Sequence, residues 1–386
     1  MKNIKAAKYL AMLTLVAAPL FAAEGDDKAF GQFQQILAGI ESRKFAPIQA
    51  AIDQADLSNR ILNSRIIEPS ARKVLNENFW QIIEESFLQN LPPAGSNVKV
   101  QLVDFAFENG KGHAGVRFNQ PNFEYAYQVF ELSYDNRSRL KIVDWFDSSK
   151  GLKFSAEIGE GLVILMPTKA ATQKQISIKN PSDLELFQVT EIFKAARDLQ
   201  PARYFQIYDE FSESLKREPF IAKNAVFLAF ASKDTDRFVR ALDIFAEVFA
   251  EDPKFALMMS DLFVRTQKYE ESYESLQRFH ADFSLQEGAI PARLSALALA
   301  LGQMEDAEKY AVEATEDEPT LELGWWSLLR VRARAENYQG ALEALTYLED
   351  NFGHRLDEAK LRRDKFQGFA SLVSSAEFKE WRGGRN

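Results

Sequence analysis

The sequence predicts an α+β domain followed by an all-α solenoid of helical hairpins, and three observations carry that prediction. Apolar residues within 27–91 recur at spacings of three and four, which is the period of an amphipathic helix. From Val98 the chain changes to β-branched and aromatic runs separated by turn residues, which is typical of strands. In the second half, Pro219, Pro253 and Pro319 lie about one and two times 34 residues apart. A period of that length indicates stacked helical pairs.

The first 23 residues have the composition of a bacterial secretory signal. Three lysines precede the apolar stretch 9–21, and Ala22 or Ala23 provides a small residue at the cleavage position. The alternative is an uncleaved membrane anchor, which the shortness of the apolar stretch disfavours. We therefore expect a periplasmic or secreted protein that has no membrane-spanning segment after cleavage.

Composition narrows the classes of function. The chain contains no cysteine, which excludes disulfides, thiolate metal sites and a cysteine nucleophile. Removing the three signal lysines takes the formal net charge from −9 to −12. Nucleic acids and anionic membranes are held by basic surfaces, so this acidity argues against both as partners. We expect no bound metal or cofactor.

The residues from 24 to 150 form the predicted N-terminal domain. Its helices occupy 27–91, and Pro92 and Pro93 end them. The predicted strands are 98–107, 114–118, 123–134 and 140–146. Short turn-like connectors join them, and short connectors can link only antiparallel neighbours, so we expect a meander. An antiparallel sheet that wraps on preceding helices is an α+β unit.

The run 125–132 followed by 141–147 resembles the NTF2-like, cystatin-like fold, and the resemblance covers roughly residues 27 to 150. It implies a curved sheet around a possible cavity. Residues 151–182 are expected to connect the two halves. Within them, 151–166 suits either a helix or a strand, and we favour a helix that ends before Pro167.

The range 183–356 contains the predicted repeats. Small residues recur at one position of the second helix, with gaps of 31, 35 and 34: Ala241, Ser272, Ala307 and Ala341. Bulky residues stand three positions earlier, at the start of that helix: Phe238, Tyr269, Met304 and Tyr338. The pattern resembles the tetratricopeptide repeat, except that Ser260, Ser295 and Leu329 replace the glycine usual in the first helix. Residues 357–386 are expected to form a cap and tail that cover the last apolar face.

Two sets of residues are of types used in cofactor-binding or metal-binding motifs. The stretch Gly110–Gly115 reads G-x-G-x-x-G, but a strand pattern follows it, so it predicts a hairpin turn instead of a dinucleotide site. His113, His280 and His354 are scattered and have no metal-ligand spacing. We therefore predict no catalytic residue.

The N-terminal domain nevertheless has candidates for a cavity. These are His113, Tyr125, Tyr127, Asp144 and Trp145. Some enzymes of the NTF2-like family use a His and an Asp in the cavity for acid/base work, which would give His113 and Asp144 a role. The alternatives are a solvent-exposed turn histidine and an aromatic face that packs on Phe79, Trp80 and Phe87.

The first helices of the repeats should line a concave surface that binds a protein or peptide. The candidates are Asp261, Val264, Arg265, Trp326, Arg330 and Arg334. Trp326 with two arginines would suit a carboxylate, although these cations also have Glu318, Glu322 and Glu336 nearby. The preferred function is a non-enzymatic exported adaptor. The alternatives are a small-ligand carrier or enzyme that uses the N-terminal cavity, and a structural part of an envelope assembly.

Overall fold

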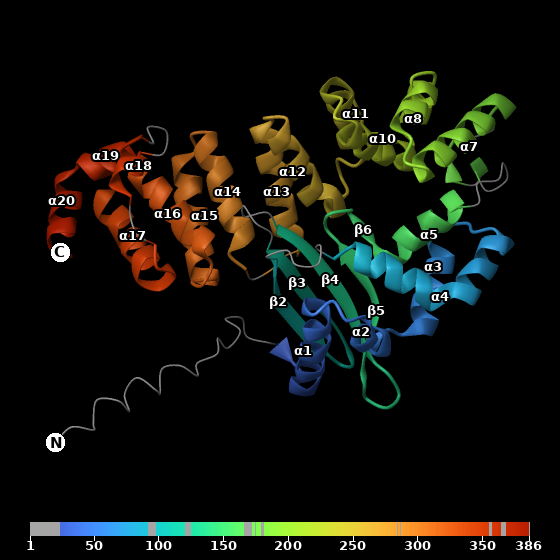
Figure 1. Cartoon of the computed structure of the whole chain (residues 1–386), viewed down its shortest axis with the longest axis horizontal. Coiled ribbons are helices and arrows are strands. Elements are labelled where there is room, and N and C mark those ends of the chain that lie inside the picture. The colour runs from blue at the N-terminus through green and yellow to red at the C-terminus, as the bar shows by residue number, and fades with distance from the viewer. Residues whose placement is uncertain are drawn as a thin grey trace. The chain divides into compact units, whose positions relative to one another are not determined.

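The computed structural model describes residues 24–91, 98–119, 125–165, 172–173, 175–178, 181–283, 285, 287–354, 357–363 and 368–385. An N-terminal helical region leads into an antiparallel sheet, and helices make up most of the rest (Figure 1). The contacts divide the chain into two compact units. The first comprises Asp26–Gln101 and Phe107–Ser284, and the second comprises Leu102–Ala106 and Leu285–Asn386 with the described residues before Asp26. The predicted signal segment, 1–23, lies outside the described residues and stays a prediction, as do the domain boundaries.

The predicted N-terminal helical region is present. It contains α1 (Asp27–Glu41), α2 (Phe45–Ala51), α3 (Gln54–Ser64) and α4 (Pro69–Gln89). Capping side chains fix two of the starts: the Asp26 carboxylate accepts the N–H groups of Lys28 and Ala29, and the Asp53 carboxylate accepts that of Asp56. Such caps satisfy amides that have no partner within the helix.

The strands follow one another in the sheet in chain order, as a meander requires. They are β1 (Glu24–Gly25), β2 (Lys99–Glu108), β3 (Lys111–Asn119), β4 (Tyr125–Tyr134), β5 (Leu140–Asp147) and β6 (Leu152–Lys153). The β3–β4, β4–β5 and β5–β6 pairs are antiparallel, and the β4–β5 register shifts between Glu131 and Leu132. The stretch Gly110–Gly115 lies in the β2–β3 hairpin, with Gly110 at φ +79°. No helix follows it, because β3 begins at Lys111.

Aromatic side chains fill the space between the sheet and its helices. Trp145 is fully buried and stacks on Phe154 with ring centroids 3.8 Å apart. Phe87 of α4 and Phe130 of β4 meet the same indole ring at 5.5 and 5.8 Å. This is the aromatic packing that the sequence offered as the alternative to a cavity.

The stretch 151–166, which suited either a helix or a strand, forms mainly a helix. After the two-residue strand β6, α5 extends over Phe154–Leu165. Gly159 allows α5 to approach α3, because a Cβ at that position would collide with the Ser64 hydroxyl. Pro167, which was predicted to end the helix, lies outside the described residues.

The described part of 183–356 is helical almost throughout. The elements of the first unit are α7 (Asp183–Arg197), α8 (Pro201–Tyr208), α9 (Glu213–Lys216), α10 (Pro219–Ser232), α11 (Thr235–Val248), η2 (Pro253–Phe255), α12 (Ala256–Arg265) and α13 (Tyr269–Phe283). Those of the second unit are α14 (Ala289–Ala300), α15 (Met304–Asp317), α16 (Glu322–Arg334) and α17 (Tyr338–Phe352). Four pairs pack against each other, namely α10 with α11, α12 with α13, α14 with α15 and α16 with α17.

The positions aligned by the repeat meet within two pairs. In one, the buried hydroxyls of Ser260 and Ser272 lie 2.9 Å apart across α12 and α13. In another, the Ser295 hydroxyl of α14 donates to the Ala307 carbonyl of α15 at 2.8 Å. The buried hydroxyls of Ser260 and Ser295 therefore each have a hydrogen-bond partner on the paired helix.

The described part of the C-terminal segment contains three short helices. They are α18 (Glu358–Arg363), α19 (Phe369–Ser374) and α20 (Ala376–Gly383). Helix α19 packs on α16 and α20 packs on α17, and the Trp381 indole N–H donates to the Thr346 hydroxyl at 2.9 Å. These contacts cover the last helical pair.

Candidate functional site

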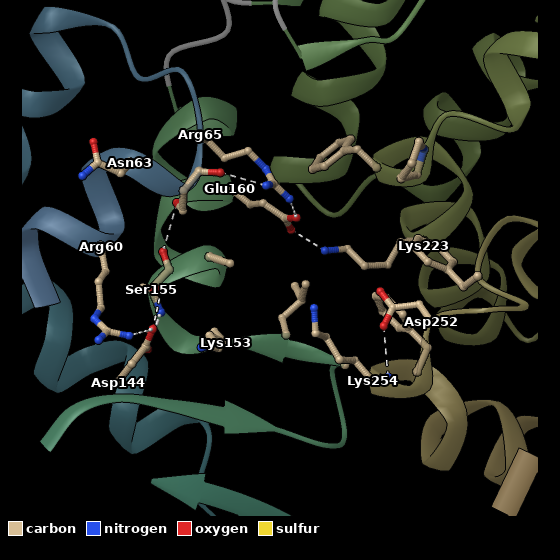
Figure 2. A pocket seen from close by; sticks show the side chains of 18 residues that line it. Arg60, Asn63, Arg65, Asp144, Lys153, Ser155, Glu160, Lys223, Asp252 and Lys254 are labelled. Carbon is tan, nitrogen blue, oxygen red and sulfur yellow. Dashed lines mark hydrogen bonds and ion pairs between the residues drawn. The ribbon is translucent and has the colours of Figure 1, made fainter. Parts of the chain in front are cut away.

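The first unit contains a cavity of about 590 Å³, which we call the polar pocket (Figure 2). Helix α3, strands β5 and β6, helix α5, the start of α10 and η2 contribute to its wall. The polar side chains are Arg60, Asn63, Ser64, Arg65, Asp144, Lys153, Ser155, Glu160, Lys223, Asp252 and Lys254. The apolar part includes Phe220, Phe249 and Phe255.

Glu160 holds two cations of the polar pocket at once. Its Oε1 accepts a hydrogen bond from Arg65 Nη2 at 2.6 Å, and its Oε2 pairs with the Lys223 ammonium (Figure 2). Lys223 is 8% exposed and Glu160 is 9% exposed. Charged side chains this deeply buried need a close partner, because water no longer solvates them.

Asp144 is a second buried carboxylate in the pocket. It accepts hydrogen bonds from the Ser155 hydroxyl at 2.6 Å, the Ser155 amide at 3.1 Å and the Trp145 amide at 2.9 Å. Burial raises the pKa of Asp144, and the hydrogen bonds from Ser155 and Trp145 oppose that rise. Arg60 Nη1 lies 3.9 Å from its Oδ2.

Arg60 and Lys153, two further cations of the pocket, pair with carboxylates that do not line it. Arg60 pairs with Asp56 at 2.9 Å and with Glu131 at 2.7 Å, and Lys153 also pairs with Glu131. Burial alone would raise the pKa of Glu131, but Lys153 and Arg60 outweigh it and hold the pKa below its usual value. These cations are thus already neutralised by fixed partners.

Lys254 differs from the other cations. The Asp252 carboxylate accepts its backbone N–H at 3.1 Å at the start of η2, and its side chain extends into the pocket (Figure 2). Within the described part of the chain, its ammonium has no carboxylate partner. It is exposed, so a ligand can reach it.

The structure does not bring the five predicted cavity residues together. Asp144 lines the polar pocket, whereas Tyr127 and Trp145 are fully buried and Tyr125 is 6% exposed. His113 is exposed on β3, where its register partner is Glu131, which in turn faces Asp144 on β5. Two strand spacings, about 10 Å, therefore separate the backbones of His113 and Asp144, too far for a direct acid/base pair.

Among the polar side chains of the pocket, sequence reasoning named only Asp144, and those it missed include Arg65, Glu160, Lys223 and Lys254. For two of them the sequence holds a usable signal. Glu160 stands within Ile158–Leu165, and Lys223 stands within Pro219–Ser232, both of which are otherwise largely apolar. A charge within an apolar helix predicts either a buried ion pair or a site.

A second cavity of about 790 Å³ in the same unit is lined by the end of α10, the start of α11 and the end of α12. We call this cavity the apolar groove, and we group with it two exposed side chains that precede lining residues on the same helices, Phe227 on α10 and Val264 on α12. Phe230 lies in its wall and is 50% exposed, and the Arg265 guanidinium lies 5.3 Å from the Phe230 ring centroid. Phe227 and Val264 are 41% and 39% exposed. Of the predicted partner-binding residues on α12, Arg265 lines the cavity, Val264 is the exposed residue before it and Asp261 is half-buried.

The predicted clamp on α16 lies in the second unit. The Trp326 indole N–H donates to Glu322 Oε1 at 2.9 Å, and His354 Nε2 lies 2.7 Å from the same oxygen. Arg330 is half-buried and Arg334 is exposed. Because Glu322 already accepts the indole N–H, a partner carboxylate would have to displace it.

Comparison with known proteins adds no family: no family model matches the chain, and no curated protein matches its sequence. Across the described ranges, no helix is long and apolar enough to cross a membrane. Among the same residues, no three or more His, Asp or Glu side chains gather in a way that could hold a metal ion.

Proposed function

We propose that this chain is a non-enzymatic adaptor of the cell envelope, which holds a protein or peptide partner on the first helices of its helical pairs. The observation that carries the proposal is the apolar groove. Phe227 and Phe230 on α10 and Val264 on α12 expose large apolar side chains on the first helices of two consecutive pairs. Clusters of exposed apolar residues on a soluble surface mark interaction sites.

The repeat pattern supports the same function. Ser260 with Ser272, and Ser295 with Ala307, meet at the positions where tetratricopeptide-like hairpins cross. In a solenoid of that kind the first helices line the concave face, which is the usual place for a peptide. The resemblance of residues 27–150 to the NTF2-like fold would make the N-terminal domain a platform for these repeats.

The chemistry of the groove indicates the kind of segment it would accept. Phe230 and Phe238 give the lining its aromatic character, and the charged residues of the lining are the two cations Lys233 and Arg265 and one carboxylate, Asp234. An extended or helical segment with apolar anchors next to an acidic residue would complement both features. The proposed partner is therefore a protein that presents such a segment.

Site-specific photo-crosslinking tests the proposal. A photoreactive phenylalanine analogue is introduced at Phe227 or at Val264, and in a matched control at Leu199, which is 76% exposed between α7 and α8. We expect one protein from the native envelope to crosslink at both groove positions and not at the control. Equal crosslinking at Leu199, or none at either groove position, would contradict the proposal.

A further inference from the structure

More cations than carboxylates line the polar pocket: the cations are Arg60, Arg65, Lys153, Lys223 and Lys254, and the carboxylates are Asp144, Glu160 and Asp252. Arg65 and Lys223 share the single carboxylate of Glu160, so this trio carries one positive charge in excess. Lys223 and Glu160 are both about nine-tenths buried and form a neutral pair, so the excess charge lies on the Arg65 side chain, which is 36% exposed. A bound anion would remove the excess.

The opposite wall adds positive potential. Lys254 extends its ammonium into the pocket, while Arg60 and Lys153 are already paired with Asp56 and Glu131. The first residues of α10, Pro219 and Phe220, also line the pocket. The start of this 14-residue helix contributes the positive end of its dipole. Arg65 and Lys254 are therefore the cations of the pocket with which an anion can pair, and they share the lining with the carboxylates Asp144 and Asp252.

The size and the apolar wall limit the ligand. A cavity of about 590 Å³ lies in the range of small-molecule sites, which is about 300 to 1,000 Å³. Phe220, Phe249 and Phe255 give one part of the wall an aromatic character. A small molecule with one anionic group and a less polar body fits these features better than a polymer does.

We propose that the polar pocket binds a small molecule through a carboxylate or phosphate group, which Lys254 and Arg65 recognise. This inference does not depend on the adaptor function, because the apolar groove shares no lining residue with the polar pocket. Carboxylate and phosphate present the same oxyanion chemistry to ammonium and guanidinium groups. The test must therefore distinguish a carboxylate ligand from a phosphate ligand.

Calorimetric titration of the full chain with inorganic phosphate and, separately, with succinate provides the test, with ionic strength held constant by chloride. We expect at least one of the two anions to bind in a saturable way. Saturation by phosphate alone assigns a phosphate-bearing ligand, and saturation by succinate alone assigns a carboxylate. Failure of both to bind overturns the proposal.

Variants identify the site. Lys254→Met should weaken binding about tenfold or more, since a charge-assisted hydrogen bond is lost at an exposed residue whose replacement leaves the fold intact. Lys73→Met is the matched control, because Lys73 is an exposed helical lysine outside the pocket. Wild-type affinity in Lys254→Met, or equal weakening in the control, would overturn the assignment.

Discussion

The polar pocket and the apolar groove are cavities of similar size with opposite chemistry, and α10 contributes to both. At its N-terminal end, Pro219, Phe220 and Lys223 face the polar pocket. Toward its C-terminal end, Ala229, Phe230 and Ala231 face the apolar groove. One end of the helix therefore buries a charge, and the other exposes aromatic rings.

Charged side chains are usually exposed and large apolar side chains are usually buried. The two ends of α10 depart from this pattern in opposite ways. Burying Lys223 is unfavourable without Glu160, and exposing Phe230 forgoes the gain of removing apolar area from water. Departures from consistent patterning are expected at functional sites. The comparison suggests a small charged ligand for one end of α10 and a macromolecular partner for the other.

The largest expected effect comes from removing the shared carboxylate of the pocket. Glu160→Leu leaves Lys223 as a buried cation without its anion and removes the partner of the partly exposed Arg65, which should lower the free energy of unfolding by about 3–5 kcal/mol. Urea denaturation followed by circular dichroism measures the change. Glu77→Leu, which breaks an exposed ion pair with Lys73, is the control and should change stability by less than about 1 kcal/mol. Equal stability of the two variants would show that the buried pair is not needed.

Gly151 provides a second way to disturb the polar pocket without touching the groove. Its φ is +64°, and a Cβ would collide with the Phe255 ring of η2. Gly151→Ala should therefore cost about 1–3 kcal/mol and weaken anion binding. Gly161→Ala, a helical position with open space around it, should be neutral or slightly stabilising in the same unfolding experiment. Loss of stability in both variants would remove the special role of Gly151.

Features that depend on local spacing, such as the buried face of a helix, can be predicted from the sequence. Contacts between residues far apart in the chain cannot. The burial of Phe33 and Ile40 in α1 and the meeting of Ser260 with Ser272 follow from spacing alone. The pair of Glu160 and Lys223 joins residues 63 positions apart, and no periodic pattern relates them. Asp144 was named because it precedes the aromatic pair Trp145 and Phe146 in a predicted strand. Arg65 and Lys254 were missed because nothing in their local sequence distinguishes them from surface cations.

The α16 clamp extends the comparison to the second unit. Trp326→Ala combined with Arg330→Ala should weaken partner capture about tenfold if this surface also holds the partner, while helicity by circular dichroism stays unchanged. Glu322, which accepts the Trp326 indole N–H, provides the control variant Glu322→Gln, which retains an acceptor. Unchanged capture by the double variant would restrict the partner to the apolar groove.

The smallest effect is the pH dependence carried by Asp144. Burial raises its pKa above 3.8 in the folded state, so the ionised carboxylate opposes folding at neutral pH. Its contribution to stability should therefore rise as the pH falls from the folded-state pKa toward 3.8. Asp144→Asn should remove this rise in denaturation measured across pH 4–7.

Asp135 provides the contrasting carboxylate for that experiment. Hydrogen bonds from the Arg139 backbone and side chain lower its pKa to about 2, so its contribution is present above 3.8 and is lost as the pH falls toward 2. Asp135→Asn should therefore alter only the acidic end of the profile. Identical profiles for both variants would contradict the assignment of these shifts.

The central claim is that a partner protein binds the apolar groove. The most direct test is fluorescence anisotropy of the partner that photo-crosslinking identifies. The labelled partner is titrated with the wild-type protein and, separately, with Val264→Asp. Val264 is 39% exposed, so the new carboxylate stays solvated and the fold is retained. We predict at least about tenfold weaker binding, since a charge placed in an apolar contact must be desolvated. Equal affinity of the two proteins would contradict the account.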